Sequence, residues 1–379
     1  MPAEVDVCIV GGGQSGLAVG YHLRRLARDA RADQHAVSFV ILDDRARPGG
    51  AWQDVWDSLH LFSPATYSSL PGWPMPSWRG AGDPDAAHVV DYLTAYQDRY
   101  DLPVERRVAV TSVHEADDRH LLVSGEDGRS WLARTVVNAT GTWRRPFWPR
   151  LPGMTTYGGR QLHTAGYRSA SDFSGDRVLV VGGGNSGAQI AADLLPAARS
   201  MTWVTKEPPR MLPDDVDGRI LFETATRAVR DRAAGIANDG VGGLGDIVAV
   251  PSVRHARDHL GLRAEPMFER LIADGARWAD GSTRSYDAVI WCTGFRPALR
   301  HLAPLRLPSR HGRPRTAPPA EESSRTGQRS PVAAAGDRRL LFVGYGDWCG
   351  PASATLIGVN RAARDAAATA VAVASGSDA

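Results

Sequence analysis

The first part of the chain holds the pattern that most constrains how it can fold. A hydrophobic run over residues 5–10 leads directly into Gly11-x-Gly13-x-x-Gly16, and an apolar-periodic segment follows. This is the order strand, glycine turn, helix that binds a dinucleotide. The first glycine permits the tight turn, the second lets a pyrophosphate approach the backbone, and the third lets the helix pack closely on the strand. The phosphates would then lie on the free N–H groups at the helix N-terminus.

A second hydrophobic run, residues 38–42, ends in Asp43-Asp44. In a dinucleotide-binding unit, an acidic residue at this place holds the ribose hydroxyl groups. On this copy alone, a glycine-rich turn in some other α/β domain stays an alternative, because the motif also occurs by chance.

The same succession recurs in the middle of the chain. Residues 178–181 form a hydrophobic run that leads into Gly182-x-Gly184-x-x-Gly187, and a helix is expected near residues 188–195. Two such fingerprints, each in the order strand, turn and helix, are much more specific than one. They predict an α/β fold with two Rossmann-like dinucleotide-binding domains.

The two units differ in what ends their second strand. Asp43 suits a free ribose and would repel a phosphate, which favours FAD in the first unit. The second unit offers Thr205 and Lys206 at this place, with Arg210 nearby. A hydroxyl group and cations suit a 2′-phosphate, so NADPH is favoured there. The alternative for Lys206 is a solvated surface lysine, with its charge offset by Glu207.

Length and charge bound the remaining choices. At 379 residues the chain can form two domains with sizeable cores. A net charge of +2 gives no reason to expect nucleic acid or an anionic membrane surface as a partner. The apolar residues 352–374 include several charged side chains and predict an amphipathic helix, not a membrane span. No metal site is expected, and the oligomeric state is left open, a homodimer included.

The three cysteines, Cys8, Cys292 and Cys349, form no C-x-x-C pair. A reducing cytosol is therefore the expected compartment. The first strand begins within the first few residues, which leaves no room for a signal peptide.

Residues 52–78 contain several tryptophans and four prolines, and they predict a long, rigid and mostly irregular segment. Two interpretations remain open: the segment covers the flavin and excludes water, or its tryptophans fill the core between domains. After it we expect a helix over 86–100, a small antiparallel sheet from 108–113, 120–123 and 131–133, and a return to the main sheet over 135–138.

The later chain adds further expectations. The two similar ends Ala139-Thr140-Gly141 and Cys292-Thr293-Gly294 predict a chain that crosses between the domains. The inserted stretch 208–262 contains Asp214–Gly218, which lacks the downstream glutamate of a calcium loop and indicates a solvated turn. A flexible glycine-rich loop is expected over 240–245 near the nucleotide, a mobile segment over 310–335, strands over 286–291 and 340–344, and a helix from about Pro351.

FAD together with NADPH means that hydride passes from the nicotinamide to the flavin, and that an acceptor then takes the electrons. Without a C-x-x-C pair a disulfide acceptor is disfavoured, and O2 is the obvious alternative. An NADPH:FAD oxidase or reductase without oxygen insertion stays open, as does a redox sensor or binding protein without turnover.

A resemblance to a known family appears just before the second fingerprint. Tyr157-x-Gly159-x-x-x-His163-x-x-x-Tyr167 resembles the F-x-G-x-x-x-H-x-x-x-Y signature of flavin-containing monooxygenases. Tyr157 replaces the usual phenylalanine. Tyr167 at the last place is nearer to the N- and S-oxidising enzymes than to the Baeyer–Villiger ones, which carry tryptophan there. His163 alone would more often be a structural histidine; within the signature the functional interpretation is favoured.

Further stretches resemble the ArsO-type flavin monooxygenases associated with arsenic resistance. These stretches are residues 49–65, 69–76, 180–189, 212–218, 242–248 and 344–359. The resemblance implies an FAD domain of residues 1–153 and 295–379 with an inserted NADPH domain of residues 154–294. It also implies a flavin C4a-hydroperoxide as oxidant, with NADP⁺ retained beside it. The substrates would be O2 and a small molecule with a soft nucleophilic arsenic, nitrogen or sulfur atom, and no side chain need be a nucleophile.

The motifs and the resemblance together name the candidate site residues, with His163 and Tyr167 as signature residues. Those predicted to hold FAD are Gly11, Gly13, Gln14, Ser15, Gly16, Asp43, Asp44, Gly50, Trp52, Trp56, His60, Val110, Thr140, Gly141 and Asp347. Those predicted to hold NADPH are Gly182, Gly184, Asn185, Ser186, Gly187, Thr205, Lys206, Arg210, Thr293 and Gly294.

Overall fold

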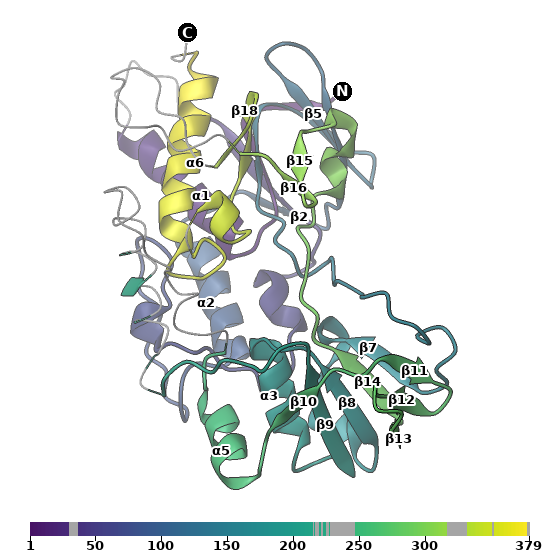
Figure 1. Ribbon diagram of the computed structural model, residues 1–379. Coiled ribbons are helices and arrows are strands. Elements are labelled where there is room, and N and C mark those ends of the chain that lie inside the picture. Colours follow the sequence, from purple (N-terminus) through teal and green to yellow (C-terminus); the bar gives the residue numbers. More distant parts are fainter. Residues whose placement is uncertain are drawn as a thin grey trace.

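The computed structural model describes residues 1–29, 37–214, 216, 220, 223–224, 227, 247–316, 332–350 and 352–376. Within these residues, two separate sheets with parallel strands carry helices on their faces, one sheet above the other in Figure 1. The predicted α/β fold with two Rossmann-like units is confirmed. The helices in this part of the chain are α1 (Gln14–Asp29), α2 (Ala86–Arg99), α3 (Asn185–Leu194), α5 (Pro251–His259) and α6 (Val359–Ala374).

The strands fall into two groups, the first sheet, which is the upper one in Figure 1, and the second sheet, which is the lower one. The first sheet contains β1 (Ala3–Val10), β2 (Phe39–Asp43), β3 (Val104–Arg106), β4 (Val110–Glu115), β5 (Leu121–Gly125), β6 (Ser130–Asn138), β17 (Ala333–Ala334) and β18 (Asp337–Phe342). The second contains β7 (Arg160–His163), β8 (Arg177–Val181), β9 (Ser200–Thr205), β10 (Ala264–Pro266) and β14 (Ala288–Trp291). Smaller antiparallel pairings join β11 (Arg270–Ile272), β12 (Gly275–Arg277) and β13 (Thr283–Ser285), and β15 (Ser309–Arg310) with β16 (Arg313–Pro314).

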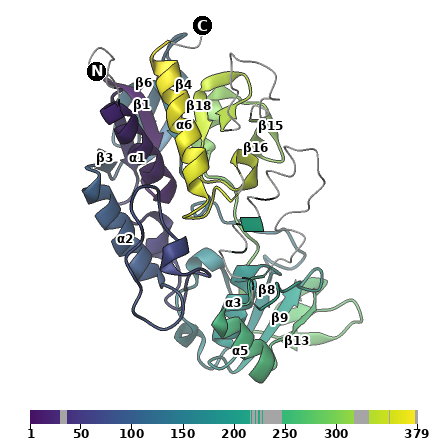
Figure 2. The same cartoon turned by 90° about the vertical axis from the view of Figure 1, so that its left-hand side faces the viewer.

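The first sheet has the order β17-β18-β6-β1-β2-β3, and β1 lies parallel between β2 and β6. Residues 7–10 of β1 are all buried. A strand in the middle of a parallel sheet is covered on both faces, which explains its unbroken hydrophobic run. Helices α1 and α6 pack side by side on one face, as Figure 2 shows. The antiparallel strands β4 and β5 cover the other face.

The predicted small antiparallel sheet is confirmed. β4 pairs with β5, and β5 pairs with the first half of β6, in antiparallel fashion. The remainder of β6 continues alongside β1 as a parallel strand and so carries the chain back into the main sheet.

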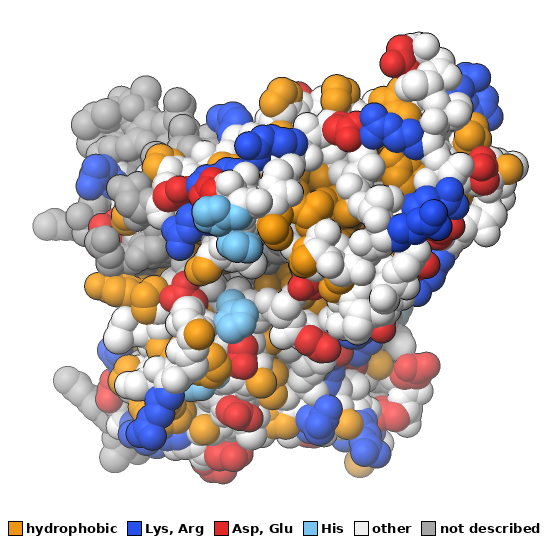
Figure 3. Space-filling view, turned by 90° about the horizontal axis from the view of Figure 1, so that it is seen from below, with side chains coloured by type: hydrophobic (Ala, Val, Ile, Leu, Met, Phe, Trp, Pro, Cys, Tyr) orange, Lys and Arg blue, Asp and Glu red, His pale blue; other side chains and the backbone are white. Residues whose placement is uncertain are grey.

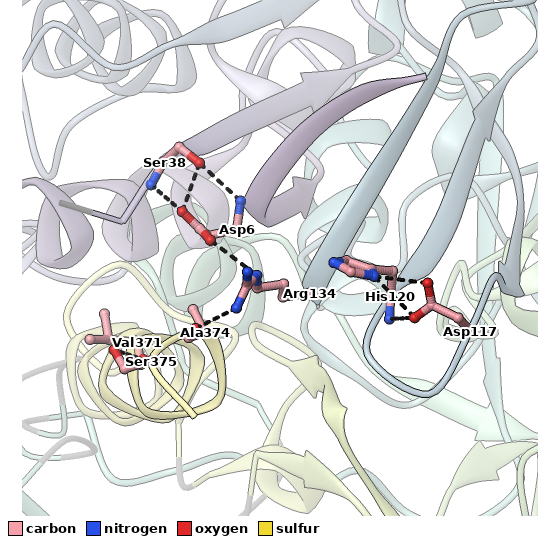
Figure 4. Close-up of polar contacts among 8 residues, drawn as sticks. All are labelled: Asp6, Ser38, Asp117, His120, Arg134, Val371, Ala374 and Ser375. Atoms are coloured by element: carbon pink, nitrogen blue, oxygen red, sulfur yellow. Dashed lines mark hydrogen bonds and ion pairs between the residues drawn. The ribbon is translucent and has the colours of Figure 1, made fainter. Parts of the chain in front are cut away.

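The amino-terminal edge of the first sheet is closed by polar contacts, drawn in Figure 4. The Asp6 carboxylate accepts hydrogen bonds from the backbone N–H and the hydroxyl of Ser38, at 2.9 and 2.8 Å. It also forms an ion pair with Arg134 at 3.5 Å, and Arg134 donates to the carbonyl oxygen of Ala374 at 2.9 Å. The opposite, carboxyl-terminal edge carries the glycine turn, and this is the edge at which open α/β sheets bind ligands.

The second sheet has the order β10-β9-β8-β14-β7, and all of its pairings are parallel. Helices α3 and α5 pack on one face of it. The strand predicted over 286–291 is β14, which begins at Ala288, and its four residues are all buried.

Two segments join the halves of the molecule, and they run antiparallel to each other. The N–H of Arg296 donates to the carbonyl oxygen of Arg145 at 2.8 Å, and the N–H of Phe147 donates to that of Gly294 at 2.9 Å. The rings of Trp143 and Phe295 stack with centroids 4.9 Å apart. The two Thr-Gly ends therefore begin crossing segments, as predicted.

The last helix begins later than predicted. α6 starts at Val359 and not near residue 351. Ala352 has a φ of 53°, a left-handed conformation that a right-handed helix does not contain. The hydroxyl of Ser353 donates to the carbonyl oxygen of Gly346 at 2.9 Å, which holds the preceding turns against β18.

Some predictions lie outside the described residues. They concern Asp215, Asp217 and Gly218 of the calcium-like turn, the glycine-rich loop 240–245, residues 317–331 of the segment expected to be mobile, and Pro351. Among the helices of the described chain, none combines the length and the apolar character needed to cross a membrane. On the face seen from below, acidic and basic side chains intermingle (Figure 3), in keeping with the small net charge.

Candidate functional site

The first glycine turn joins β1 to α1 and is shaped by close packing. A Cβ on Gly11 would lie 2.4 Å from the carbonyl oxygen of Ala139, and one on Gly16 would lie 1.9 Å from that of Gly11. Both contacts are far below van der Waals distance, so the protein itself requires these two glycines. Gly13 differs, because a Cβ there would meet only the Cα of Gly50, at 3.6 Å.

The second glycine turn, between β8 and α3, repeats this division. A Cβ on Gly182 would lie 2.2 Å from the carbonyl oxygen of Cys292, and one on Gly187 would lie 2.2 Å from that of Gly182. A Cβ on Gly184 would meet nothing within 4 Å. In both units the middle glycine therefore has room for a Cβ without a clash, and a pyrophosphate that lies against the backbone requires such room. The two turns fit the dinucleotides that the sequence predicts.

Polar side chains begin both helices. Gln14 and Ser15 open α1, and Asn185 and Ser186 open α3. The side-chain oxygen of Asn185 accepts a hydrogen bond from the N–H of Val248 at 2.8 Å. The predicted residues therefore stand at the helix N-termini, where backbone N–H groups favour an anion.

Asp43 ends β2 directly beside the first glycine turn. A Cβ on Gly12 would lie 2.8 Å from its carboxylate, so the acid and the turn are in contact. Arg106, at the end of β3, donates a hydrogen bond to the carboxylate. The N–H of Arg45 also donates to it, at 3.3 Å. Burial raises the pKa of Asp43, and the charge of Arg106 opposes that rise.

Thr205 occupies the corresponding position in the second unit. It ends β9, as Asp43 ends β2, and the two strand pairs have the same register relative to their glycine turns. A Cβ on Gly183 would lie 3.5 Å from the methyl group of Thr205, as one on Gly12 would face Asp43. A buried carboxylate in the first unit is thus replaced by a buried threonine in the second.

Two further residues predicted for FAD lie near Asp43. Asp44 forms an ion pair with Arg144 at 2.9 Å, which links the strand end to the crossing segment. Val110 begins β4, just after Val108, whose N–H donates to the carbonyl oxygen of Asp43 at 2.9 Å. Both therefore lie around the strand end that the sequence singled out.

The aromatic segment begins against the first turn of α1. The indole N–H of Trp52 donates to the amide oxygen of Gln14 at 2.9 Å. The Gln14 amide nitrogen donates to the carbonyl oxygen of Ala354, also at 2.9 Å. Gly50 adopts a φ of 56°, and a Cβ there would lie 2.8 Å from the Cα of Gly13. The structure therefore brings these predicted residues together at one helix start.

Trp56 lies elsewhere, in the core of the second half of the molecule. It is 4 % exposed and meets the ring of Tyr167 edge-on, with centroids 6.3 Å apart. The Tyr167 hydroxyl donates to the carboxylate of Asp193 in α3 at 2.5 Å. The N–H of Asp57 donates to the carbonyl oxygen of Arg168 at 3.0 Å. The signature residue Tyr167 thus anchors the aromatic segment to the second sheet.

The remainder of this segment packs on α2. The Tyr92 hydroxyl donates to the carbonyl oxygen of Trp73 at 2.7 Å, and the Tyr96 hydroxyl donates to that of Pro71 at 2.6 Å. His60 interacts with the carbonyl oxygen of Asp83 at 2.7 Å, in the stretch that leads into α2. The second half of the segment therefore packs in the core of the first half of the molecule, and both interpretations of the segment remain predictions.

The crossing segments hold the remaining predicted residues. The Thr140 hydroxyl donates to the carbonyl oxygen of Ala298 at 2.8 Å and lies 2.7 Å from the hydroxyl of Tyr345. Gly141 follows with a φ of 63°. Asp347 belongs to the 3-10 turn Asp347–Cys349 that follows β18. Thr140 and Gly141 thus lie at the carboxyl edge of the first sheet, beside this turn.

His163 is bound into the other crossing segment. Its Nε2 lies 3.0 Å from the carbonyl oxygen of Gly294, and its ring meets Phe295 edge-on at 4.9 Å. Burial lowers its pKa, so the imidazole is neutral near pH 7. The Thr293 hydroxyl donates to the carbonyl oxygen of Phe147 at 2.5 Å. Both side chains hold the crossing between the two halves.

Thr205 and Lys206 line a pocket of about 740 Å³ at the end of β9. Pockets that hold small ligands have this size. Arg210 lies just beyond in the chain and is not among the residues that line the pocket. The structure thus joins two of the three residues predicted for the 2′-phosphate.

Sequence reasoning missed Arg106 and Tyr345. Arg106 ends a three-residue strand that has no hydrophobic run, so no pattern placed it beside Asp43. Tyr345 follows β18, and only the parallel pairing of β18 with β6 brings it to Thr140. A glycine-flanked tyrosine after a late strand was the one available signal.

The chain is similar to known proteins in family, sequence and fold. Residues 8–221 match the family model described as pyridine nucleotide-disulphide oxidoreductase. A flavin-containing monooxygenase from Stenotrophomonas maltophilia is 45% identical, with a TM-score of 0.82 over 98% of this chain and 99% of that one. An uncharacterized CzcO-like oxidoreductase from Geobacillus kaustophilus is 30% identical over 303 residues, 77% of this chain and 80% of that protein.

A plant enzyme is similar over a shorter stretch. Indole-3-pyruvate monooxygenase YUCCA6 from Arabidopsis thaliana is 32% identical over 227 residues, 56% of this chain and 51% of that protein. These matches, together with two glycine turns that each fit a dinucleotide, identify the family of this chain and its cofactors. The chain belongs to the pyridine nucleotide-disulphide oxidoreductase family, as a flavin-containing monooxygenase, an NADPH-dependent oxidoreductase that uses FAD.

Proposed function

We propose that this enzyme inserts one atom of O2 into a soft nucleophilic atom, arsenic, nitrogen or sulfur, of a small molecule and consumes NADPH. The observation that carries the proposal is that two equivalent strand ends hold different residues. Asp43 ends β2 in the first unit, and Thr205 ends β9 in the second. One chain thus offers a site for a free ribose and a site that tolerates a phosphate. We assign FAD to residues 1–153 and 295–379, and NADPH to residues 154–294.

The cysteines support O2 over a disulfide as the electron acceptor. Cys8, Cys292 and Cys349 are the three cysteines of the sequence, and all are buried and free. Burial raises the pKa of the Cys292 thiol to about 12 and also raises those of Cys8 and Cys349. Thiols that stay protonated and separate do not exchange with a disulfide substrate. Free thiols also agree with a reducing cytosol as the compartment.

Bound FAD supplies the chemistry that passes electrons from NADPH to O2. This chain's residues bind and orient the cofactor and exclude water. Gly13 and the start of α1 would receive the pyrophosphate, and Asp43, fixed by Arg106, would receive the ribose hydroxyl groups. Trp52 would hold the aromatic segment to the FAD side through Gln14, and Trp56 holds the same segment to the second sheet. The segment thereby contacts both halves, and we propose that it helps to exclude water from the flavin.

The substrate class rests on the resemblance to ArsO-type enzymes and on Tyr167 at the last signature position. The test is a screen of NADPH oxidation with trivalent arsenicals, tertiary amines, thioethers and cyclic ketones, with product analysis for each. We expect oxidised arsenical, N-oxide or sulfoxide in proportion to the NADPH consumed, and no lactone from the ketones. NADPH oxidation that yields only hydrogen peroxide with every compound would support the alternative, an NADPH:FAD oxidase.

A further inference from the structure

A second pocket, of about 580 Å³, lies between the first half of α2 and residues 47–57 of the chain. Pockets of this size hold small molecules. One wall is the 3-10 turn Gly50–Asp54, and the other is formed by residues 85–94 at the start of α2. None of the glycine-turn residues 11–16 lines this pocket, which we call the α2 pocket. It is therefore separate from the phosphate cradle of the first unit.

Contacts within the protein fix the walls of the α2 pocket. Gly49 has a φ of 111°, and a Cβ there would lie 3.0 Å from a methyl group of Val90, so the turn packs tightly on the helix. The Gln53 amide nitrogen donates to the carbonyl oxygen of Arg47 at 3.0 Å, which closes the turn on itself. The pocket is thus formed before a ligand arrives, and a preformed site lowers the entropy lost on binding.

The apolar part of the α2 pocket includes two indole rings. Trp52 and Trp56 line it from the aromatic segment, and Val90 lines it from the helix. Tryptophan provides a large apolar surface, and the face of its ring attracts organic cations such as quaternary ammonium groups. This lining suits a ligand with an apolar body.

The charged side chains of the α2 pocket are mainly acidic. Asp57, Asp85 and Asp91 contribute carboxylates, and Arg47 contributes the one cation among the described residues that line it. In the described part of the chain, no ion pair joins Asp57, Asp91 or Arg47 to a side chain of opposite charge. Asp57 and Asp91 are both exposed, so their charges can act on a ligand in the pocket. The excess of negative charge favours a cation.

The start of α2 alone would favour an anion, because a helix N-terminus carries a partial positive charge. Here its cap, Asp85, already accepts a hydrogen bond from the N–H of His88 at 2.8 Å. Asp91 adds a second carboxylate one turn later. A bound anion would lie among three carboxylates with only Arg47 to offset them, and like charges at short distance repel. The balance of charge therefore decides for a cation.

We propose that the α2 pocket binds an organic ammonium ion that carries an apolar body. The apolar body would pack against Trp52 and Trp56, and the positive charge would lie beside Asp57 and Asp91. The inference goes beyond the proposed function and does not depend on it, because binding in this pocket requires neither NADPH nor O2.

The test uses three probes that share a phenyl ring and differ in charge: benzyltrimethylammonium, benzyl alcohol and phenylacetate. The quaternary nitrogen has no lone pair and cannot accept an oxygen atom, so its binding is measured apart from turnover. Titration calorimetry at low ionic strength gives the affinities of the FAD-loaded protein and of Asp57→Asn, Asp91→Asn, their double variant and Arg47→Gln. Asp98→Asn is the matched control, because Asp98 is an exposed aspartate of α2 that does not line the pocket. Melting temperatures verify that each variant is folded.

We expect the wild type to bind benzyltrimethylammonium about 10-fold more tightly than the other two probes. Each single Asn variant should weaken the binding of this cation about 3-fold, and the double variant about 10-fold, since independent effects add. Arg47→Gln should tighten it about 2-fold, because a like charge is removed. Asp98→Asn should leave it unchanged, and 0.5 M salt should weaken it.

Three results would overturn the proposal. Unchanged affinity in the double variant would place the cation elsewhere on the protein. Equal affinity for all three probes would mean that the pocket does not select by charge. Phenylacetate that binds more tightly than the cation, and is lost in Arg47→Gln, would identify an anion site.

These outcomes are independent of oxygen transfer. An enzyme that proves to be an NADPH oxidase should still bind the ammonium ion in the α2 pocket. Conversely, failure of the three-probe test would leave the proposed oxygen insertion untouched, because none of the probes reports on the flavin reaction.

Discussion

Arg106 and Asp43 stand opposite each other at the ends of β3 and β2, and the arginine donates a hydrogen bond to the carboxylate. Both side chains are largely buried. The acid that the sequence assigns to the ribose is therefore held ionised and in place by a cation from the neighbouring strand. Removing one partner of a buried ion pair leaves the other charge uncompensated, which is strongly destabilising.

We predict that Arg106→Gln lowers the free energy of unfolding of the apoprotein by about 3 kcal/mol at pH 7.5. Burial already raises the pKa of Asp43, and without Arg106 the pKa should rise further. A raised carboxyl pKa destabilises the folded state above that pKa, and the penalty fades as the pH falls and the group binds a proton. The difference from wild type in urea unfolding should thus be large at pH 7.5 and small near pH 4.

The control for this prediction is Asp43→Asn in the Arg106→Gln background. A neutral amide needs no charge partner, so the double variant should regain most of the lost stability at pH 7.5. A loss that is the same at both pH values would mean that Arg106 acts through packing alone.

The two kinds of glycine in the first turn should respond differently to alanine. Gly13→Ala should give folded protein with little bound FAD, because a Cβ there fits the protein at 3.6 Å and would occupy the phosphate cradle. Gly16→Ala should fail to fold stably, because its Cβ would lie 1.9 Å from a carbonyl oxygen. Circular dichroism and the flavin absorbance of purified protein measure both effects. Full flavin content in Gly13→Ala would refute the placement of FAD.

The substitution Thr205→Asp would place an aspartate at the strand end of the second unit, as Asp43 stands at the equivalent strand end of the first. A carboxylate beside a 2′-phosphate repels it, and one beside a free ribose accepts its hydroxyl groups. We expect the KM for NADPH to rise by at least 10-fold, a difference of about 1.4 kcal/mol, while the KM for NADH stays equal or falls. Steady-state kinetics with both cofactors measure the ratio. An equal rise for both would indicate damage to the turn.

Two tryptophans of the aromatic segment provide a matched pair. Trp56 lies in the core of the second unit, so Trp56→Ala should lower the free energy of unfolding by about 3–5 kcal/mol. Trp52→Phe keeps a ring and removes the hydrogen bond to Gln14, so it should cost about 1 kcal/mol of stability and speed the dissociation of FAD. Urea unfolding and flavin fluorescence separate the two. Unchanged FAD dissociation in Trp52→Phe would show that this contact does not support the cofactor.

The parts of the site that follow from a local sequence pattern could be predicted from the sequence. Strand, glycine turn and helix form a local pattern, and the strand end at Asp43 lies one residue beyond the hydrophobic run. The contact of Arg106 was not predictable, because β3 has three half-buried residues and no hydrophobic run. The start of α6 was misplaced, because a left-handed alanine at residue 352 leaves no mark in the composition.

The signature histidine illustrates the same limit. The sequence favoured a functional role for His163, and the structure places it against Gly294 and Phe295 in a crossing segment. Its functional role within the signature stays a prediction. The contact between His163 and Gly294 could not be predicted from the sequence, because these two residues lie far apart in the chain.

The central claim is that this enzyme transfers oxygen, and the most direct measurement is a reaction under ¹⁸O2 with NADPH and the best substrate of the screen. We predict that each product molecule carries one ¹⁸O atom and that product forms in proportion to NADPH oxidised. Label found only in hydrogen peroxide or water, with the organic or arsenical compound unlabelled, would contradict the account and identify the enzyme as an NADPH oxidase.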